Sequence, residues 1–216
     1  MQGLKNNIAN ILTLSNAVIG LISVFLTISG NYTWAALMIF VAIIFDILDG
    51  EVARKLKITS DLGAELDSLS DIISFGIASS ILLYVSLFNQ STIGAFVAIL
   101  IVICGVYRLA RFNVVKKQKT FTGLPIPAMA AIVSSFVLTE NVFSTMQITS
   151  IFVIVALLMV SKIPYPIINN LDSKNIRLFV VLGLIFALVL FLINPLYFIM
   201  APFMYYAILG MFSIKK

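Results

Sequence analysis

The sequence DILDGEVAR occupies residues 46–54, and GAELDSLSD occupies residues 63–71. Apolar runs flank both stretches, so four carboxylates lie where so hydrophobic a chain would cross a membrane: Asp46, Asp49, Asp67 and Asp71. A charged side chain near the centre of a bilayer costs about 2.5–3.5 kcal/mol, and such groups usually face a cavity, a partner or a metal. Four acids together therefore predict a functional site.

Helical spacing relates the four acids to one another. Asp46 and Asp49 are three residues apart, and Asp67 and Asp71 are four apart, so each pair shares one face of a helix. The polar segment 54–61 lies between the pairs and predicts a hairpin connection that turns the second helix back against the first. We therefore expect the two pairs to converge.

A cluster of carboxylates without histidine or cysteine favours the hard cations Mg²⁺ and Mn²⁺ over zinc or copper. Four carboxylates suffice to bridge two ions about 3.5–4 Å apart, an arrangement used for displacement at phosphorus. The alternatives are an interhelical salt-bridge network and the ion pathway of a cation transporter. Arg54 is the one basic residue close enough in sequence to pair with the acids, and it cannot neutralise four of them.

The residues from Asp46 to Asp71 fit D-x2-D-G-x2-A-R-x8-G-x3-D-x3-D at every specified position. This pattern resembles the signature of the CDP-alcohol phosphatidyltransferase family. The resemblance implies an integral membrane enzyme that moves a phosphatidyl-type group from a CDP-linked lipid to an alcohol and releases CMP. It implies one cation held by the first three acids, and a second held by Asp46, Asp67 and Asp71. Asp71 would also be the general base.

The same resemblance gives roles to the smaller residues of the pattern. Gly50, Ala53 and Gly63 would let the nucleotide approach the backbone, and Arg54 would lie near the phosphates.

Composition independently indicates a membrane protein. Hydrophobic residues make up 61% of the 216 positions, charged residues make up 11%, and the mean hydropathy is +1.12; soluble domains carry about 25% charged residues. The absence of histidine excludes histidine-based catalysis, and the single cysteine, Cys104, excludes an intramolecular disulfide. The net charge of +5 fits an anionic membrane surface better than nucleic acid.

Hydropathy predicts an all-α, polytopic membrane helix bundle in one domain, residues 1–216. Residues 1–12 read as a short interfacial helix. About eight apolar stretches that can cross the hydrocarbon core follow, at about 13–29, 34–52, 64–88, 92–115, 126–144, 147–163, 176–193 and 195–212.

With eight spans, all 14 Lys and Arg residues fall on one side of the membrane. The positive-inside rule then predicts that both termini and the acidic cluster face the cytoplasm. Tyr197, Tyr205 and Tyr206, in the last span, read as interfacial anchors.

A second group of polar residues ends the fourth predicted span. Arg108 and Arg111 share a helix face, Asn113 follows, and FTGLPIPA occupies residues 121–128. Arginine binds carboxylate or phosphate bidentately, so we expect at least one of the two to bind an acceptor carboxylate, with Asn113 or the turn at 122–125 aiding its orientation. The alternative is that both arginines only flank the membrane span and extend their charged ends to the aqueous interface.

RLARFN at 108–113, FTGLPIPA at 121–128 and SKIPYP at 161–166 are similar to the phosphatidylserine synthase branch of the family. This resemblance implies transfer from CDP-diacylglycerol, or an archaeal ether-lipid equivalent, to L-serine, and it suggests a homodimer. Alternatives are a sibling enzyme that uses glycerol 3-phosphate or inositol phosphate, a prenyltransferase and a cation transporter.

Overall fold

Helices form nearly all the regular structure of the chain. The computed structural model describes residues 2–56, 60–114, 121–139, 143–165 and 173–212. Its α-helices are α1 (Gln2–Ile28), α2 (Tyr32–Leu56), α3 (Asp61–Asp71), α4 (Ala78–Leu82), α5 (Thr92–Val114), α6 (Ile126–Leu138), α7 (Thr145–Val160), α8 (Ser173–Ile193) and α9 (Ala201–Phe212). π-helical turns at Ile72–Ile77 and Leu83–Leu87 continue α3 and α4, and a 3₁₀ turn, Pro195–Phe198, precedes α9. This confirms the all-α class.

Each of the eight stretches predicted to cross the membrane contains a helix. Among the described residues, three helical runs are long and apolar enough to span a bilayer: 10–28, 61–87 and 92–114. Shorter apolar helices occupy Ile126–Leu138, Thr145–Val160 and Val181–Leu192. These helices are those of an integral membrane protein.

The residues predicted as an interfacial helix and the start of the first predicted span lie in one helix. Residues 2–28 form one uninterrupted helix, α1. The sequence between residues 4 and 19 contains neither proline nor glycine, so nothing there breaks the hydrogen-bond ladder. The polar N-terminal turns therefore continue the axis of the span.

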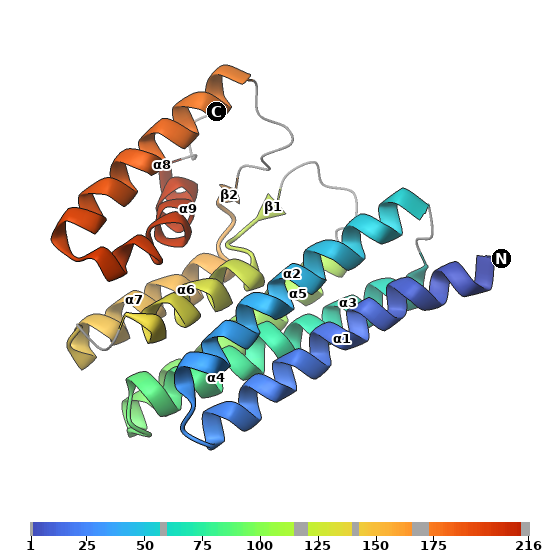
Figure 1. Cartoon of the computed structure of the whole chain (residues 1–216), viewed down its shortest axis with the longest axis horizontal. Coiled ribbons are helices and arrows are strands. Elements are labelled where there is room, and N and C mark those ends of the chain that lie inside the picture. The colour runs from blue at the N-terminus through green and yellow to red at the C-terminus, as the bar shows by residue number, and fades with distance from the viewer. Residues whose placement is uncertain (1, 57–59, 115–120, 140–142, 166–172, 213–216) are drawn as a thin grey trace.

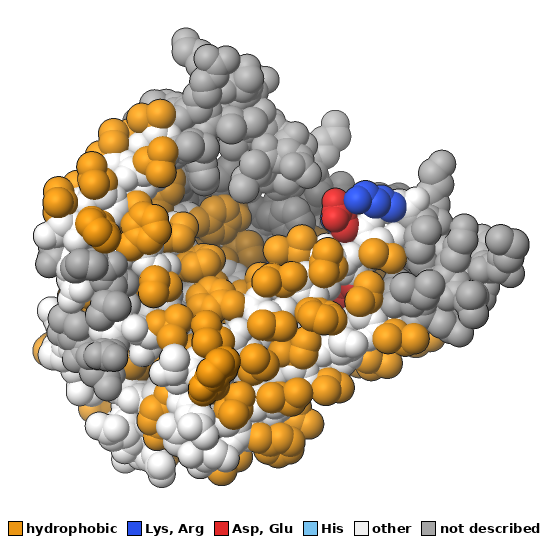
Figure 2. Space-filling model, viewed as in Figure 1, with side chains coloured by type: hydrophobic (Ala, Val, Ile, Leu, Met, Phe, Trp, Pro, Cys, Tyr) orange, Lys and Arg blue, Asp and Glu red, His pale blue; other side chains and the backbone are white. Residues whose placement is uncertain are grey.

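Large apolar side chains cover the outside of the bundle, as expected where lipid is the solvent. Val18 and Phe25 on α1 are 56% and 58% exposed, and Phe96 on α5 is 71% exposed. On the face drawn in Figure 2, apolar side chains extend over most of the described surface, and the few acidic and basic side chains gather near the C-terminal end of α2.

The first half of the chain is built on the close packing of α1 with its neighbours. Figure 1 shows α1, α2 and the run from α3 to α4 side by side. Helix α1 contacts α2, α3 and α4. Ser23 Oγ of α1 donates to the carbonyl of Ala35 in α2 at 2.8 Å, and Ser74 Oγ donates to the carbonyl of Asn16 at 2.9 Å. Small residues permit this approach: a Cβ at Gly20 would lie 2.5 Å from Ser74 Cα.

A short antiparallel ladder connects two segments of the second half of the chain. β1 (Phe121–Thr122) pairs with β2 (Pro164–Tyr165) in the register Phe121 to Tyr165. Gly123, at a φ of +82°, follows β1, and a Cβ there would collide with the carbonyl oxygen of Met159. Glycine is therefore required at this turn. The sequence did not predict the ladder.

The contact between Gly20 and Ser74 gives a test of the packing. In Gly20→Val, the new side chain meets backbone, so we expect a loss of about 1–3 kcal/mol in the free energy of unfolding. The control is Leu21→Val on the same helix, where the side chain is 46% exposed. Thermal unfolding in detergent measures both. Equal stability of the two variants would show that α1 does not pack this closely on residues 72–77.

Candidate active site

The two predicted acidic pairs meet between α2 and α3. One carboxylate oxygen from each of Asp46, Asp49 and Asp67 lies within 4.8 Å of the others. Asp46 and Asp49 come from successive turns of α2, and Asp67 comes from the last turns of α3. The hairpin expected from residues 54–61 thus places the second helix against the same site, although residues 57–59 lie outside the described residues.

Asp71 joins the cluster from one turn further along α3. Its side chain is 7% exposed and shares a hydrogen bond with the carboxyl group of Asp46. The π-helical turn begins at the next residue, Ile72. Such turns hold an extra residue and are frequent at functional sites, because they re-aim the side chains on either side. Here the turn follows the last acid and carries Ser74 onto α1.

Two buried carboxylate oxygens have no hydrogen-bond partner among the described residues: Asp49 Oδ2 and Asp71 Oδ1. Asp49 is 4% exposed, and it accepts hydrogen bonds from the Thr13 side chain and the Gly50 backbone. A buried carboxylate with an unused oxygen is costly unless a cation or donor satisfies it. The cluster can therefore bind a metal ion, and its all-oxygen donor set fits Mg²⁺ or Mn²⁺.

A cavity of about 230 Å³ adjoins these acids. Its lining includes the four residues predicted to meet the nucleotide and two from α1: Gly50, Ala53, Arg54, Gly63, Asn10 and Thr13. Both glycines face other residues that line the cavity. A Cβ at Gly50 would lie 3.3 Å from Arg54 Nη1, and a Cβ at Gly63 would lie 3.1 Å from Ser60 Oγ. The sequence analysis did not assign Asn10 and Thr13 to the site, although their spacing of three residues puts them on one face of α1.

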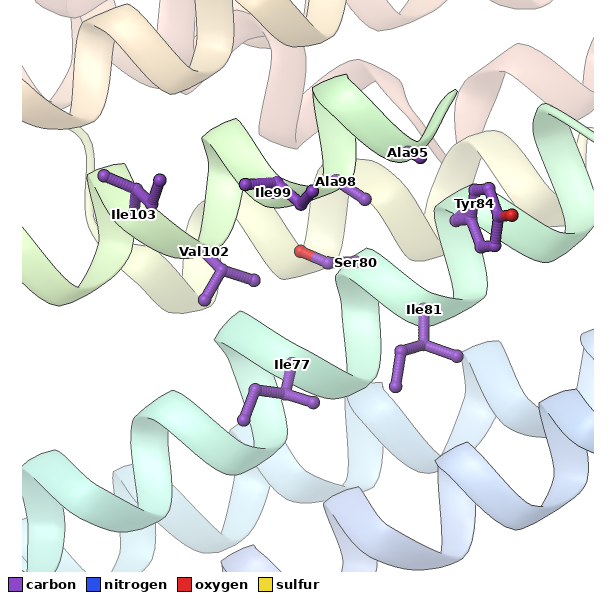
Figure 3. Close-up of a pocket in the computed structure, with 9 residues that line it drawn as sticks. All are labelled: Ile77, Ser80, Ile81, Tyr84, Ala95, Ala98, Ile99, Val102 and Ile103. Carbon is purple, nitrogen blue, oxygen red and sulfur yellow. The ribbon is translucent and has the colours of Figure 1, made fainter. Parts of the chain in front are cut away.

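A larger hollow of about 420 Å³ lies elsewhere, between the α4 region and α5. Figure 3 shows its lining as apolar side chains from both helices, with Ser80 and Tyr84 as the polar members. No acidic or basic side chain lines it. Of these two cavities, only the smaller one adjoins the acidic cluster.

The second predicted group divides into residues with different structural roles. Arg111 donates from Nη1 to the carbonyl of Val160 at 2.9 Å, and from Nη2 to those of Thr122 and Ser161 at 3.0 Å. It therefore ties the end of α5 to β1 and the end of α7. Asn113 Nδ2 donates to Ser68 Oγ at 3.0 Å, and this bond ties α5 to α3 between Asp67 and Asp71.

Arg108 is the arginine that faces the acids. It is 6% exposed, its Nε has no hydrogen-bond partner among the described residues, and it interacts electrostatically with Asp71. A buried guanidinium with an unused donor is suited to an incoming anion. Arg108 and Arg111 share a helix face as predicted, but only Arg108 combines an unused donor with a position near Asp71.

Tyr206, one of the tyrosines predicted as membrane anchors, also interacts with other parts of the fold. Its ring packs against that of Tyr165 with centroids 5.4 Å apart, and it interacts electrostatically with Arg108. Tyr206 therefore lies at the edge of the site. Sequence reasoning missed it because α9 carries no pattern that relates it to α5.

The comparisons with known proteins agree with this geometry. Residues 6–161 match the model of the family described as CDP-alcohol phosphatidyltransferase. The chain belongs to this family. The matched range contains all four acids of the cluster as well as Arg108, Arg111 and Asn113.

The sequences of several curated relatives align with most of this chain. An archaetidylserine synthase of Methanothermobacter thermautotrophicus is 41% identical, over 77% of this chain and 72% of its own length. A CDP-diacylglycerol–serine O-phosphatidyltransferase of Helicobacter pylori is 36% identical, over 83% of this chain and 80% of its own. The protein of that name from Bacillus subtilis is 35% identical, over 80% of this chain and 97% of its own.

Proposed function

We propose that this CDP-alcohol phosphatidyltransferase moves the phosphatidyl-type group of a CDP-lipid to the hydroxyl of L-serine and releases CMP. The observation that carries the proposal is the convergence of Asp46, Asp49 and Asp67 within 4.8 Å, in the signature order of the family. The names of the relatives support serine as the acceptor: one is an archaetidylserine synthase, and the others are CDP-diacylglycerol–serine O-phosphatidyltransferases. The lipid is a diacylglycerol or an ether-linked equivalent.

The four acids are proposed to hold two divalent cations, Mg²⁺ or Mn²⁺. Asp46, Asp49 and Asp67 would ligate one, and Asp46, Asp67 and Asp71 the other. The unpartnered oxygens of Asp49 and Asp71 support this assignment. When bound, such ions supply electrostatic stabilisation of the pyrophosphate and of the charge that develops on the departing CMP.

In the proposed reaction, the serine hydroxyl oxygen forms a bond to the lipid-bearing phosphorus, and the bond from that phosphorus to the CMP oxygen breaks. Asp71 accepts the hydroxyl proton as general base. Asn113 braces the helix beside Asp71 through its hydrogen bond to Ser68. Burial of Asp71 excludes bulk water, which would otherwise compete with serine.

The remaining residues bind the two substrates. Gly50, Ala53 and Gly63 keep the cavity open to the nucleotide, and Arg54 lies at its edge, near the expected position of the phosphates. Arg108 is proposed to bind the carboxylate of serine. Arg111 already donates to three backbone carbonyls, so we assign it to the framework that holds Arg108 in place.

In the membrane, we propose eight spans with both termini and the active site on the cytoplasmic side of the cell membrane. All 14 basic residues then lie on that side, which supports this orientation. The lipid tails would enter sideways from the cytoplasmic leaflet. The working unit is proposed to be a homodimer, from the resemblance to the family.

Serine-dependent release of CMP tests the function. Purified protein is incubated with Mg²⁺ or Mn²⁺, CDP-diacylglycerol or its ether analogue, and one acceptor: L-serine, glycerol 3-phosphate or inositol phosphate. We expect release of CMP with L-serine and not with either of the other two acceptors. Asp71→Asn should lower kcat about 10²–10⁴-fold, the usual contribution of a general base. Glu65→Gln, an exposed acid on the same helix, is the matched control and should retain activity.

Preference for a phosphorylated acceptor would instead identify a sibling enzyme of the same family. Substantial turnover by Asp71→Asn would remove that residue from the role of base. CMP release from none of the three acceptors would leave the transporter alternative, in which the acids conduct a cation.

Orientation is tested by labelling single cysteines in a Cys104→Ala background. We expect a membrane-impermeant thiol reagent to label Asn31→Cys and Gln90→Cys from outside intact cells, because both positions are exposed in connections without basic residues. Lys162→Cys, also exposed, should react only after the cells are opened. The opposite pattern would place the active site on the outer face.

A further inference from the structure

Tyr206 lies on α9, a helix outside the range 6–161 that the family model matches. α9 nevertheless contacts α6 and β2 in the middle of the fold, and Figure 1 shows it beside β2. The C-terminal helix can therefore contribute side chains to the active site.

The position of Tyr206 is fixed by Tyr165. Tyr165 is 2% exposed, and its hydroxyl donates to the carbonyl of Ala207 at 3.2 Å. Its ring packs against that of Tyr206 at an interplanar angle of 39°. Tyr165 thus holds α9 both through the backbone next to Tyr206 and through the Tyr206 ring itself.

The same framework fixes Arg108. Tyr165 belongs to β2, which pairs with β1, and Arg111 donates to the carbonyl of Thr122 in β1. Arg111 is one turn from Arg108 on α5. The ladder therefore positions the arginine and the tyrosine relative to each other, although they come from helices far apart in the sequence.

Arg108 interacts electrostatically with the carboxyl group of Asp71 and with the phenol of Tyr206. The Tyr165–Tyr206 ring pair and the β1–β2 ladder hold Tyr206 at the same end of the fold as Arg108. An anion that reaches the unused donor of Arg108 would lie close to the Tyr206 ring. A phenol hydroxyl is a hydrogen-bond donor, and a hydrogen bond to a charged acceptor is stronger than one to a neutral acceptor.

We infer that Tyr206 is a specificity-determining residue, whose hydroxyl donates a hydrogen bond to the acceptor carboxylate that Arg108 binds. The inference rests on the proposed transfer to serine. It implies that acceptors without a carboxylate lose the contacts of both residues at once, because a buried arginine and a phenol would remain unpaired. The last helix would thus select the acceptor while the aspartate motif performs the chemistry.

Ordinary core packing is the competing explanation, and the neighbouring tyrosine illustrates it. Tyr205 packs on α8: its ring lies 6.0 Å from that of Phe186, and a Cβ at Gly183 would lie 3.1 Å from it. Tyr205 is therefore a matched control, since it has the same side chain, on the same helix, and packs against a different part of the fold.

The test is steady-state kinetics on Tyr206→Phe and Tyr205→Phe, with L-serine and with ethanolamine, which is serine without its carboxylate. For Tyr206→Phe we expect the KM for serine to rise about tenfold or more, the effect of one hydrogen bond to a charged group. The KM for CDP-diacylglycerol, the kcat and the kcat/KM for ethanolamine should stay at the wild-type values. Tyr205→Phe should match the wild type for serine.

An unchanged KM for serine in Tyr206→Phe would overturn the inference, as would an equal loss with serine and ethanolamine. Thermal unfolding of both variants accompanies the kinetics, and a serine-specific rise in KM at wild-type stability supports the contact. Failure of the wild-type protein to release CMP with serine is a different result, because it refutes the proposed function before Tyr206 is tested.

Discussion

The burial of four carboxylates among apolar helices is the constraint on which the rest of this structure depends. In an apolar environment, like charges repel strongly, and each ionised group loses its water. The structure meets part of this cost with donors from the protein: Thr13 and the Gly50 backbone reach Asp49. Two oxygens, on Asp49 and Asp71, remain for a ligand. The site therefore leaves two buried carboxylate oxygens available to a cation or a substrate.

Close helix packing keeps those carboxylates together. Gly20 allows residues 72–77 to touch α1, Ser74 bonds across the contact, and the π-helical turn there follows directly after Asp71. On the other side of the site, Arg111 donates hydrogen bonds to three backbone carbonyl groups of β1 and the end of α7. Without these contacts, the acids could separate and take up water. The small residues of α1 and the hydrogen bonds of Arg111 thus support the helices that carry the acidic cluster.

The sequence predicted what depends on local spacing. Asp46 and Asp49 share a face because they are three residues apart, and hydropathy located the helices because each must cover its own backbone polar groups. It could not predict the role of Arg111, whose partners are backbone carbonyls that become available only where β1 and the end of α7 meet. Nor could it relate Tyr206 to Arg108, because their electrostatic interaction depends on how α9 returns to the bundle. Residues 2–12 differ from the first span in polarity, yet both lie in α1, because a change in polarity does not interrupt a helix.

The central claim is that the four aspartates hold two divalent cations at the place of reaction. Its most direct test is anomalous diffraction from crystals of the protein grown with Mn²⁺ and a CDP-lipid. We expect two anomalous peaks about 3.5–4 Å apart between α2 and α3, the separation used for displacement at phosphorus. Asp46 and Asp67 should contact both peaks, Asp49 one peak and Asp71 the other. Manganese bound away from these carboxylates, or aspartates paired only with basic side chains in the presence of the metal, would contradict the claim.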